Sequence, residues 1–400
     1  MADASMAIMV SRLGIPNPPE IWSRYWNESL AAFDSAHPDF LDPGYLTDQA
    51  HRLKIADEPL GVMLSAAEMI RNSPDLTLLI RLWHYMLPHT DDFGEEIDVW
   101  PLPEKAMGDL APMFRAIVAM SALDHMGEGY RKYGLSNDVM EMSLAYMHIW
   151  LEDYHARFGV WGVDDLSWIL LHFGCKIFEL GRLQFMPRRC RLGIYVYRNR
   201  TDGSLTVLAE PGLKYRTDGL RDGSHDFFDP NAWTTRLTVT DDAITGNPIT
   251  PDGFAHPETV EISRDEWEEV LSPGSMVLDV HIPSSGKLTP ESCDDSFRQS
   301  VEFFARYFPD LDWKAYTIST WLLDYQLRQM LPDDSNIIRF QRRFYSVPIM
   351  TGDADTMGIV FGSQSRDLST LRRDTSLRRA ILDYVALGHR MCNQGGFVLR

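Results

Sequence analysis

The chain has 400 residues, with 38 lysines and arginines against 57 aspartates and glutamates, and a formal net charge of -19 at pH 7. That charge repels nucleic acids and anionic lipid surfaces, and no apolar run approaches the roughly 20 residues that a membrane-spanning helix needs. We therefore expect a globular protein of two or more domains that binds neither nucleic acid nor membrane.

The first residues and the cysteines indicate the cellular compartment. The segment Met1–Ser5 contains an acidic residue and lacks the basic region of a signal peptide. The four cysteines, Cys175, Cys190, Cys293 and Cys392, lie too far apart for a zinc knuckle or a redox motif. We expect reduced thiols and a cytoplasmic protein.

The first 184 residues form the expected N-terminal domain, and its pattern is helical. Apolar residues recur at helical spacing and are interrupted by helix-stop signals such as Gly14–Pro18 and Asn72–Pro74. The expected helices are Pro19–Ser35, Leu60–Arg71, Asp75–Leu87, Pro103–Tyr133 with a break near Gly127, Ser136–Phe158 and Asp164–Leu180.

Two side-chain patterns of this half admit a functional interpretation. His148, Glu152 and His155 share one helix face, but two histidines two turns apart reach a common ion poorly, so we expect no metal. An aromatic run favours packing between helices, with an apolar wall for a long acyl chain as the alternative. Its members are Tyr146, Trp150, Tyr154, Phe158, Trp161 and Trp168.

The second domain, residues 185–400, begins where the pattern changes to short β-rich runs. A Gly-containing loop joins Arg191–Asn199 to Leu205–Ala209 and predicts a hairpin. A loop-rich insertion, Gly212–Glu258, follows. The remaining expected elements are a helix at Arg264–Leu271, strands at Met276–Ile282 and Lys314–Trp321, a helix at Asp324–Leu331, strands at Ile337–Val347 and Thr356–Phe361, and a final helix at Leu368–Arg390.

The turn after the strand Met276–Ile282 is the most informative feature of this domain. Thr289 is a good N-cap and Pro290 fits the first helical position, so a helix begins there and presents unpaired backbone N–H groups to the turn. Such a turn can cradle a phosphate. Alternatively, Glu291, Asp294 and Asp295 complement the helix dipole and the turn only connects two elements. The candidate phosphate-binding residues are Ile282, Ser284, Ser285, Gly286, Lys287, Leu288 and Thr289.

The order hairpin, strand, helix, strand, helix, strand is typical of an acetyltransferase-type fold. Several strings, given at the end of this paragraph, resemble a bacterial family of acyltransferase-domain proteins with an N-acyltransferase-like helical N-terminal domain and a GNAT-like C-terminal domain. The resemblance covers nearly the whole chain and implies acyl-CoA as the acyl donor. The turn departs from the usual GNAT phosphate loop in having one glycine, Gly286. The strings are Val277–Pro283, Trp321–Asp324, Leu331–Ile337 with Phe340 and Gln341, and Gly246–Gly253.

Acyl transfer needs a base, a proton donor to the departing thiolate, and donors to the oxyanion. His281, at the strand end beside the turn, is the candidate base, and a histidine that stabilises the turn is the alternative. Tyr325 is the candidate acid unless it only packs there. Ser335 and Asn336 either cap a turn or donate to the acyl carbonyl. Cys293 is either a nucleophile near a helix N-terminus or a buried small side chain.

We therefore predict an α+β protein in which a helical N-terminal domain packs on a GNAT-like mixed sheet, with the active cleft between the two domains. The leading hypothesis is transfer of an acyl group from acyl-CoA to an amine or hydroxyl of a small molecule. A non-catalytic ligand-binding protein on a degenerate GNAT fold is the second hypothesis, and a thioester hydrolase that depends on Cys293 is the third. The short basic run Arg339–Arg343 is more suited to one anionic cofactor than to a nucleic acid.

Overall fold

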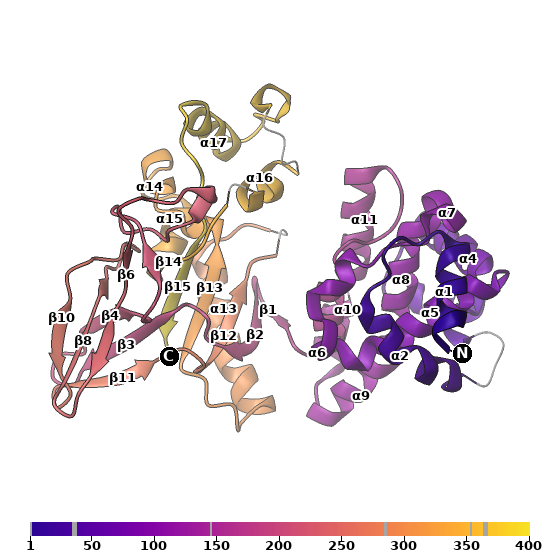
Figure 1. Cartoon of the computed structure of the whole chain (residues 1–400), viewed down its shortest axis with the longest axis horizontal. Coiled ribbons are helices and arrows are strands. Elements are labelled where there is room, and N and C mark those ends of the chain that lie inside the picture. The colour runs from indigo at the N-terminus through magenta and orange to yellow at the C-terminus, as the bar shows by residue number, and fades with distance from the viewer. Residues whose placement is uncertain (1, 34–37, 145, 284–285, 353, 363–366) are drawn as a thin grey trace. The chain divides into compact units, whose positions relative to one another are not determined.

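The computed structural model describes residues 2–33, 38–144, 146–283, 286–352, 354–362 and 367–400. The chain divides into two compact units, Met1–Glu179 and Leu180–Arg400. Figure 1 labels the elements of each unit. The first unit is helical. The described strands belong to the second unit, except that β1, Phe178–Leu180, crosses the boundary between the two. This is the expected α+β class.

The N-terminal unit contains the expected helices, with corrections to two of them. The helix predicted over Pro103–Tyr133 is interrupted at Gly108, where φ is +55°, and again at Ala122 rather than near Gly127, so it forms α7, α8 and α9. The helix predicted over Asp164–Leu180 ends at Phe173. The helices are α1 Ala2–Leu13, α2 Glu20–Ala31, α3 Pro43–Arg52, α4 Asp57–Arg71, α5 Pro74–Met86, α6 Thr90–Phe93, α7 Glu104–Met107, α8 Ala111–Ser121, α9 Leu123–Tyr133, α10 Asn137–Leu144, α11 Tyr146–Phe158 and α12 Leu166–Phe173.

Aromatic rings fill the centre of the N-terminal unit. Trp83 of α5 lies 5.0 Å from Trp100, 5.2 Å from Phe114 and 5.9 Å from Trp22, measured between ring centroids. The aromatic run predicted as helix packing behaves differently along its length. Tyr146 stacks on the buried His172, whereas Phe158 is 55% exposed. The run therefore packs at its start and reaches the surface at Phe158.

The C-terminal unit contains more strands than the sequence pattern predicts. The segment Arg264–Leu271, expected as a helix, contains β11, because Trp267–Leu271 pairs with β3 and long-range pairing overrides the local preference. The loop-rich insertion contains β5 to β9. The strands are β1 Phe178–Leu180, β2 Leu183–Arg189, β3 Ile194–Asn199, β4 Leu205–Ala209, β5 Lys214–Tyr215, β6 Trp233–Thr234, β7 Leu237–Val239, β8 Ala243–Gly246, β9 Pro248–Ile249, β10 Val260–Ser263, β11 Trp267–Leu271, β12 Met276–His281, β13 Ala315–Thr320, β14 Tyr345–Pro348 and β15 Gln394–Leu399.

Two expected strands of this unit are wrong. Most of Ile337–Val347 is not strand, because Ser335 caps the helix α15, and only the end belongs to β14. The segment Thr356–Phe361 lies in the helix α16, where the buried Met357 and Val360 are three residues apart as on one helix face. The helices are α13 Pro290–Tyr307, α14 Leu327–Met330, α15 Asn336–Gln341, α16 Ala354–Phe361 and α17 Ser376–Ala386.

A mixed six-stranded sheet organises the unit, with strand order β1-β2-β12-β13-β15-β14. The strands β12 and β13 run parallel, whereas β2 and β12, β13 and β15, and β15 and β14 pair antiparallel. The strand β15, which the sequence pattern did not predict, lies between β13 and β14. The expected strands Met276–Ile282 and Lys314–Trp321 are confirmed as β12 and β13.

The two faces of this sheet carry different layers. On one face, Phe185 of β2 and Tyr316 of β13 contact Phe297 of α13, and Tyr316 shares a hydrogen bond with Ser300 of the same helix. On the other face, Val277 and Ala315 join a buried cluster with residues of the four-stranded sheet β11-β3-β4-β9. Figure 1 shows α13 beside β12 and β13, and the smaller strands on the other side.

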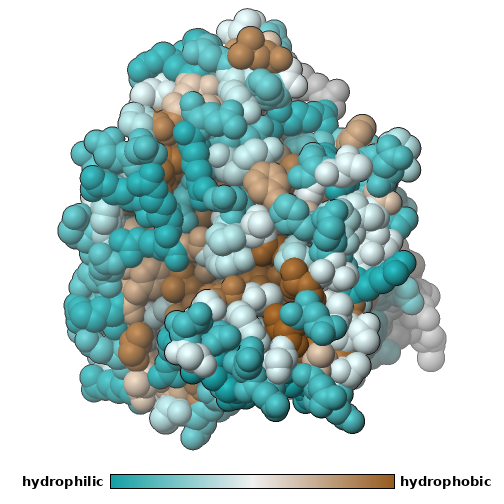
Figure 2. All heavy atoms as spheres, turned by 90° about the vertical axis from the view of Figure 1, so that its left-hand side faces the viewer, coloured by the Kyte–Doolittle hydropathy of each residue, from teal (hydrophilic) through white to brown (hydrophobic). Residues whose placement is uncertain are grey.

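The outer surface of the smaller sheets is mainly hydrophilic. Figure 2 looks onto this face of the C-terminal unit and shows hydrophilic side chains over most of it, with hydrophobic side chains gathered in a hollowed band. Throughout the described part of the chain, the helices are too short or too polar for any of them to traverse a lipid bilayer.

Candidate active site

The side chains of β12 that face away from α13 change from apolar to polar along the strand. Residues two apart in a strand share a face, so Val277, Asp279 and His281 point the same way. On the neighbouring β13, Ala315 pairs with Val277 and Thr317 pairs with Asp279. The apolar start of this face is buried in the core, and its polar end carries the candidate site.

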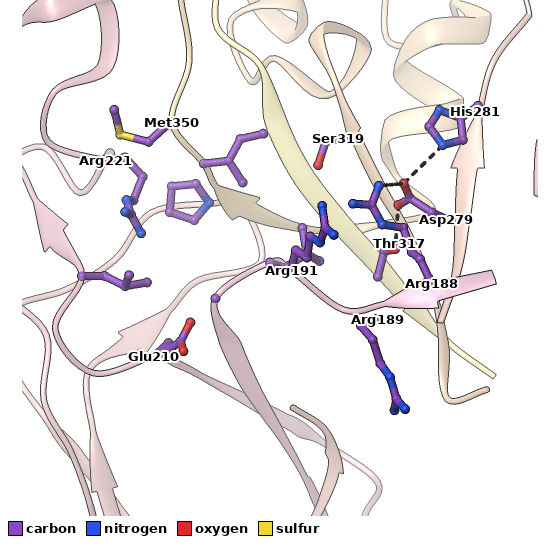
Figure 3. A pocket seen from close by; sticks show the side chains of 15 residues that line it. Arg188, Arg189, Arg191, Glu210, Arg221, Asp279, His281, Thr317, Ser319 and Met350 are labelled. Carbon is purple, nitrogen blue, oxygen red and sulfur yellow. Dashed lines mark hydrogen bonds and ion pairs between the residues drawn. The ribbon is translucent and has the colours of Figure 1, made fainter. Parts of the chain in front are cut away.

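The carboxylate of Asp279 is the centre of this polar group. Its Oδ1 accepts a hydrogen bond from the Thr317 hydroxyl at 2.8 Å, and its Oδ2 lies 3.0 Å from Nη1 of Arg188 and 3.2 Å from Nε2 of His281. Figure 3 shows these three side chains converging on Asp279. Burial by itself would raise the pKa of the Asp279 carboxyl, but the contacts with His281, Thr317 and Arg188 outweigh it, and the pKa is lowered from its ordinary value of 3.8.

Directly beyond Asp279, the parallel strands stop pairing. The register of β12 and β13 covers Val277–Asp279 against Ala315–Thr317, after which β12 continues to His281 and β13 to Thr320. The backbone groups that these ends turn toward each other are suited to hydrogen bonds with an extended ligand lying between the strands. His281 stands at this point of separation.

The turn after β12 is open at Gly286 and Lys287, both of which are exposed. Gly286 has a φ of +74°, which favours glycine, and a Cβ added there would come no nearer than 3.9 Å to any atom, from Arg182. The guanidinium of Arg182 donates to the carbonyl oxygens of Gly286 at 3.2 Å and Lys287 at 3.3 Å. The predicted residues Ser284 and Ser285 lie outside the described residues.

The helix after the turn begins as the sequence predicts. Thr289 accepts a hydrogen bond from the backbone N–H of Ser292 at 3.2 Å and caps α13. Ile282 and Leu288 pack against the apolar cluster that contains Trp321 and Leu322. They anchor the two ends of the turn.

Two of the acidic residues that could have complemented the helix dipole are paired with arginines. Asp294 forms an ion pair with Arg343, and Asp295 forms one with Arg298. These contacts lower the pKa of both carboxyls. The guanidinium groups of Arg182 and Arg343 also donate to backbone carbonyls at the start of α13, and the exposed Lys287 precedes that helix by three residues, an arrangement that suits an anion.

A cavity of about 490 Å³ opens on the polar part of the sheet face. Figure 3 shows the labelled side chains around it. His281 and Asp279 lie at one end of the cavity. Its lining consists of Arg188, Arg189, Arg191, Leu192, Gly193, Glu210, Leu213, Arg221, Asp279, His281, Thr317, Ser319, Pro348, Ile349 and Met350.

The other residues predicted for catalysis do not line this cavity. The Tyr325 ring meets the Phe254 ring at 5.0 Å, and burial raises the pKa of its phenol, which keeps its proton at neutral pH. Ser335 accepts a hydrogen bond from the Ile338 N–H at 3.3 Å and caps α15, and Asn336 begins that helix. The structure thus brings together His281, Asp279, Thr317 and Arg188, and places these three predicted residues elsewhere.

Cys293 has the environment of a packed side chain. It is 1% exposed, and burial raises the pKa of its thiol despite the neighbouring Arg343. A nucleophilic cysteine needs a lowered pKa and access to substrate, so the environment of Cys293 opposes the hydrolase hypothesis. All four cysteines are buried, and none of them forms a disulfide.

The sequence interpretation missed the partners of His281, although one signal was present. Asp279 precedes His281 by two residues, and in a strand this spacing alone places both side chains on one face. Arg188 was harder to find, because it belongs to β2, which the sequence pattern did not predict as a strand. Thr317 requires the register of β13.

The predicted metal candidates remain apart. His155 stacks on Trp161 with ring centroids 4.1 Å apart, and no group of three or more histidine, cysteine, aspartate or glutamate side chains is placed to hold a metal ion among the described residues. The expectation that the protein uses no metal stays a prediction.

Comparison with known proteins identifies both units. Residues 45–175 match the N-acyltransferase N-terminal domain, and residues 177–398 match the GNAT-like C-terminal domain. No curated protein matches the chain.

Similar solved structures cover nearly the whole chain. A crystal structure of an acyltransferase with decanoyl-CoA and teicoplanin has a TM-score of 0.68 at 20% identity, covering 98% of this chain and 99% of that one. An acyltransferase mutant with octanoyl-CoA has a TM-score of 0.67 at 19% identity with the same coverage. At this identity the likeness establishes the fold. Because the GNAT-like match spans more than half of its length, the chain belongs to the family that combines an N-acyltransferase N-terminal domain with a GNAT-like C-terminal domain.

Proposed function

We propose that the protein transfers an acyl group from acyl-CoA to an amine or hydroxyl of a small molecule. The observation that carries the proposal is the pair Asp279–His281, which stands where two parallel strands part and beside an exposed turn at a helix N-terminus. The base, the gap between the strand ends that would take an extended thioester, and the proposed phosphate site all lie at or beside residues 279–289.

The donor is held by the turn and the parting strands. The phosphates of acyl-CoA bind at the start of α13, where the backbone N–H groups of the turn and the side chains of Lys287 and Arg182 supply positive charge. The candidate residues remain those of the segment 282–289. The amide-containing arm of the donor lies between the ends of β12 and β13 and brings the thioester to His281.

His281 acts as the base, and Asp279 positions it. The carboxylate beside Nε2 favours the tautomer with the proton on Nε2, so Nδ1 is the ring nitrogen that accepts the proton. The acceptor nitrogen or oxygen attacks the thioester carbon and gives its proton to Nδ1. A new C–N or C–O bond forms, the C–S bond breaks, and its electron pair leaves with the sulfur of CoA. The thiolate of CoA then takes a proton, for which Tyr325, outside the cavity and protonated at neutral pH, stays the proposed donor.

The similar solved structures support the choice of donor. Their bound molecules include octanoyl-CoA, decanoyl-CoA and CoA, and two of those structures also contain teicoplanin or 10C-teicoplanin. They favour a medium-chain acyl-CoA as the first donor to test here.

The direct test combines binding and turnover. Decanoyl-CoA and CoA are titrated by calorimetry, and release of CoA thiol is followed with a panel of small amines. We expect micromolar to millimolar binding, and we expect His281→Gln to reduce kcat by about 10²-fold or more with little change in donor affinity. Lys287→Gln should instead weaken donor binding. No heat and no thermal shift with millimolar decanoyl-CoA would overturn the proposal.

The same variants separate an enzyme from a binding protein. If the chain only binds acyl-CoA, His281→Gln and Tyr325→Phe will leave affinity unchanged and the wild type will release no thiol with any acceptor. Arg264→Gln is a suitable control, because this exposed arginine lies outside the cavity and donates to the Thr240 carbonyl.

A further inference from the structure

The cavity beside His281 has a charge balance opposite to that of the chain. Four arginines and two carboxylates line it, whereas the whole chain has 38 basic and 57 acidic side chains. The arginines are Arg188, Arg189, Arg191 and Arg221, and the carboxylates are those of Asp279 and Glu210. A concave site lined by one sign of charge concentrates ligands of the other sign. The cavity therefore favours an anion in a protein that otherwise repels anions.

One of these arginines pairs with the carboxylate of the candidate site, and two others contact neutral groups. Arg188 pairs with Asp279. Arg189 donates to the carbonyl oxygen of Gly274 at 2.9 Å, and the guanidinium of Arg221 lies 5.3 Å from the centre of the Tyr215 ring. Among the described residues, no ion pair joins Arg189, Arg191 or Arg221 to a carboxylate. Their charge is available to a ligand.

The backbone around Arg191 is fixed. Its neighbour Cys190 donates from its N–H to the Ser275 carbonyl at 2.8 Å and accepts from the Gly274 N–H at 3.1 Å. Arg221 is held by a β-bridge to Tyr215. Arginines on fixed backbone form the planar, two-point contacts that suit a carboxylate or a phosphate.

The arrangement of the cavity separates the anion from the reacting atom. Figure 3 shows His281 and Asp279 at one side, Arg221 and Met350 at the other, and Arg191 between them. Glu210 also lines the cavity and lies below Arg221 in this view. Apolar side chains of Leu192, Leu213 and Ile349 complete the lining. A ligand that spans the cavity would meet a base at one end, apolar walls along its length and guanidinium groups at the other end.

We propose that this cavity binds the acyl acceptor, and that the acceptor is an amine or alcohol carrying an anionic group, most simply a carboxylate, bound by Arg191 and Arg221 with its nucleophilic atom at His281. The inference rests on the proposed function and adds the chemical class of the acceptor. A size of about 490 Å³ suits a small molecule.

The phosphates of the acyl donor are the other possible source of an anion, and the positions of the two sites disfavour them. The cavity lies on the sheet face that carries Asp279 and Thr317, opposite the face that packs on α13 through Phe185 and Tyr316. The start of α13 has its own cations, Arg182 and Lys287. Donor phosphates therefore have a site that does not use Arg191 or Arg221.

The experiment compares each carboxylate with its own amide. The probes are 4-aminobutyrate, 8-aminooctanoate and phenylalanine, each paired with its primary amide, and the donor is decanoyl-CoA. Calorimetry without donor measures binding, and thiol release measures transfer. We expect at least one carboxylate to bind about tenfold or more tightly than its amide, and we expect Arg191→Gln and Arg221→Gln each to remove that difference.

The controls separate the possible failures. Arg191→Gln changes an exposed side chain and should leave folding intact, even if Arg221→Gln, which removes the contact with Tyr215, disturbs it. Arg264→Gln removes the same charge outside the cavity and should change the affinity for neither the carboxylates nor their amides.

Equal binding of every carboxylate and its amide would overturn this inference while leaving acyl transfer intact. A second result would also overturn it: Arg191→Gln weakens the binding of CoA but leaves the binding of dephospho-CoA and of the carboxylates unchanged. The arginine would then bind a phosphate of the donor. If the wild type does not bind decanoyl-CoA, the proposed function itself is overturned.

Discussion

Asp279 determines how His281 is presented, and its role differs from that of a structural carboxylate. Its substitution by Asn places an NH2 or a carbonyl beside His281 Nε2 and removes the preference for one tautomer. We expect Asp279→Asn to lower kcat by about 10²-fold with a small change in the KM of the donor. Asp312→Asn, which changes an exposed carboxylate paired with Lys314, is the matched control. Equal kcat values for both variants would contradict the positioning role.

The same carboxyl contributes to stability in a defined pH range. Because the pKa of Asp279 is lowered in the folded state, its stabilising contribution is present above the ordinary value of 3.8 and is lost as the pH falls through the folded value. Urea unfolding of the wild type and of Asp279→Asn should therefore converge at strongly acidic pH.

Asp324 has the opposite dependence. It is fully buried and accepts hydrogen bonds from the backbone N–H groups of Gln326 at 2.9 Å and Cys392 at 2.7 Å, yet burial raises its pKa to about 6. Folding then favours the protonated carboxyl, so stability declines as the pH rises from 3.8 to about 6 and the loss is complete above that range.

Substitution of Asp324 tests this dependence. Asp324→Asn will be less stable than the wild type at every pH, because the single oxygen of Asn replaces the two that accept from the backbone N–H groups of Gln326 and Cys392. Its stability will not show the decline between pH 3.8 and about 6, because Asn does not titrate. Between pH 4.5 and 7.5 the difference in unfolding free energy should shift in favour of the variant by about 2 kcal/mol. A constant difference across that range would show that Asp324 titrates normally.

At the scale of elements, Gly395 of β15 lies directly against two side chains that line the cavity. A Cβ added to Gly395 would approach Leu192 to 2.7 Å and Ile349 to 3.0 Å, and both side chains line the cavity. We expect Gly395→Ala to cost about 1–3 kcal/mol of stability and to raise the KM of the acceptor, with donor affinity unchanged. Calorimetric titration of decanoyl-CoA and acceptor kinetics on the folded variant would check this, and weakened donor binding would contradict it.

The elements also show which parts of the fold the sequence could predict. The strand Met276–Ile282 and the capped helix after it could be predicted, because their signals are an apolar run, a turn and a Thr-Pro helix start, all set by neighbouring residues. Short segments were not. Trp267–Leu271, Ile337–Gln341 and Thr356–Phe361 have apolar residues compatible with either structure, and pairing or burial decided between them.

The candidate site followed the same division. His281 and the turn came from local patterns, whereas Arg188, Thr317 and the other lining arginines come from segments that only the sheet brings together. The strings shared with the family also had a partly structural meaning. Gln341, for example, is buried and donates to the carbonyl oxygens of Leu322 and Asp324 at 2.8 and 2.9 Å.

At the scale of the molecule, each unit has its own core. Trp83 lies among aromatic rings of the N-terminal unit, and Phe304 of α13 is buried in the C-terminal unit. We expect Trp83→Ala to cost about 3–5 kcal/mol and to increase amide hydrogen exchange in α4, α5 and α8 far more than in β12 and β13, with Phe304→Ala doing the reverse. Exchange that rises equally in both units for either variant would indicate a single cooperative structure.

The position of β15 between β13 and β14 has a consequence for biosynthesis. The edge of β13 is complete at Thr320, but its partner begins at Gln394, 74 residues later. At about 5–20 residues per second a ribosome needs on the order of 4–15 s to add them. During that interval the nascent chain carries an unsatisfied strand edge, the kind of surface that chaperones protect and that neighbouring nascent chains can capture. Slowing translation before residue 394 should therefore reduce the yield of folded protein.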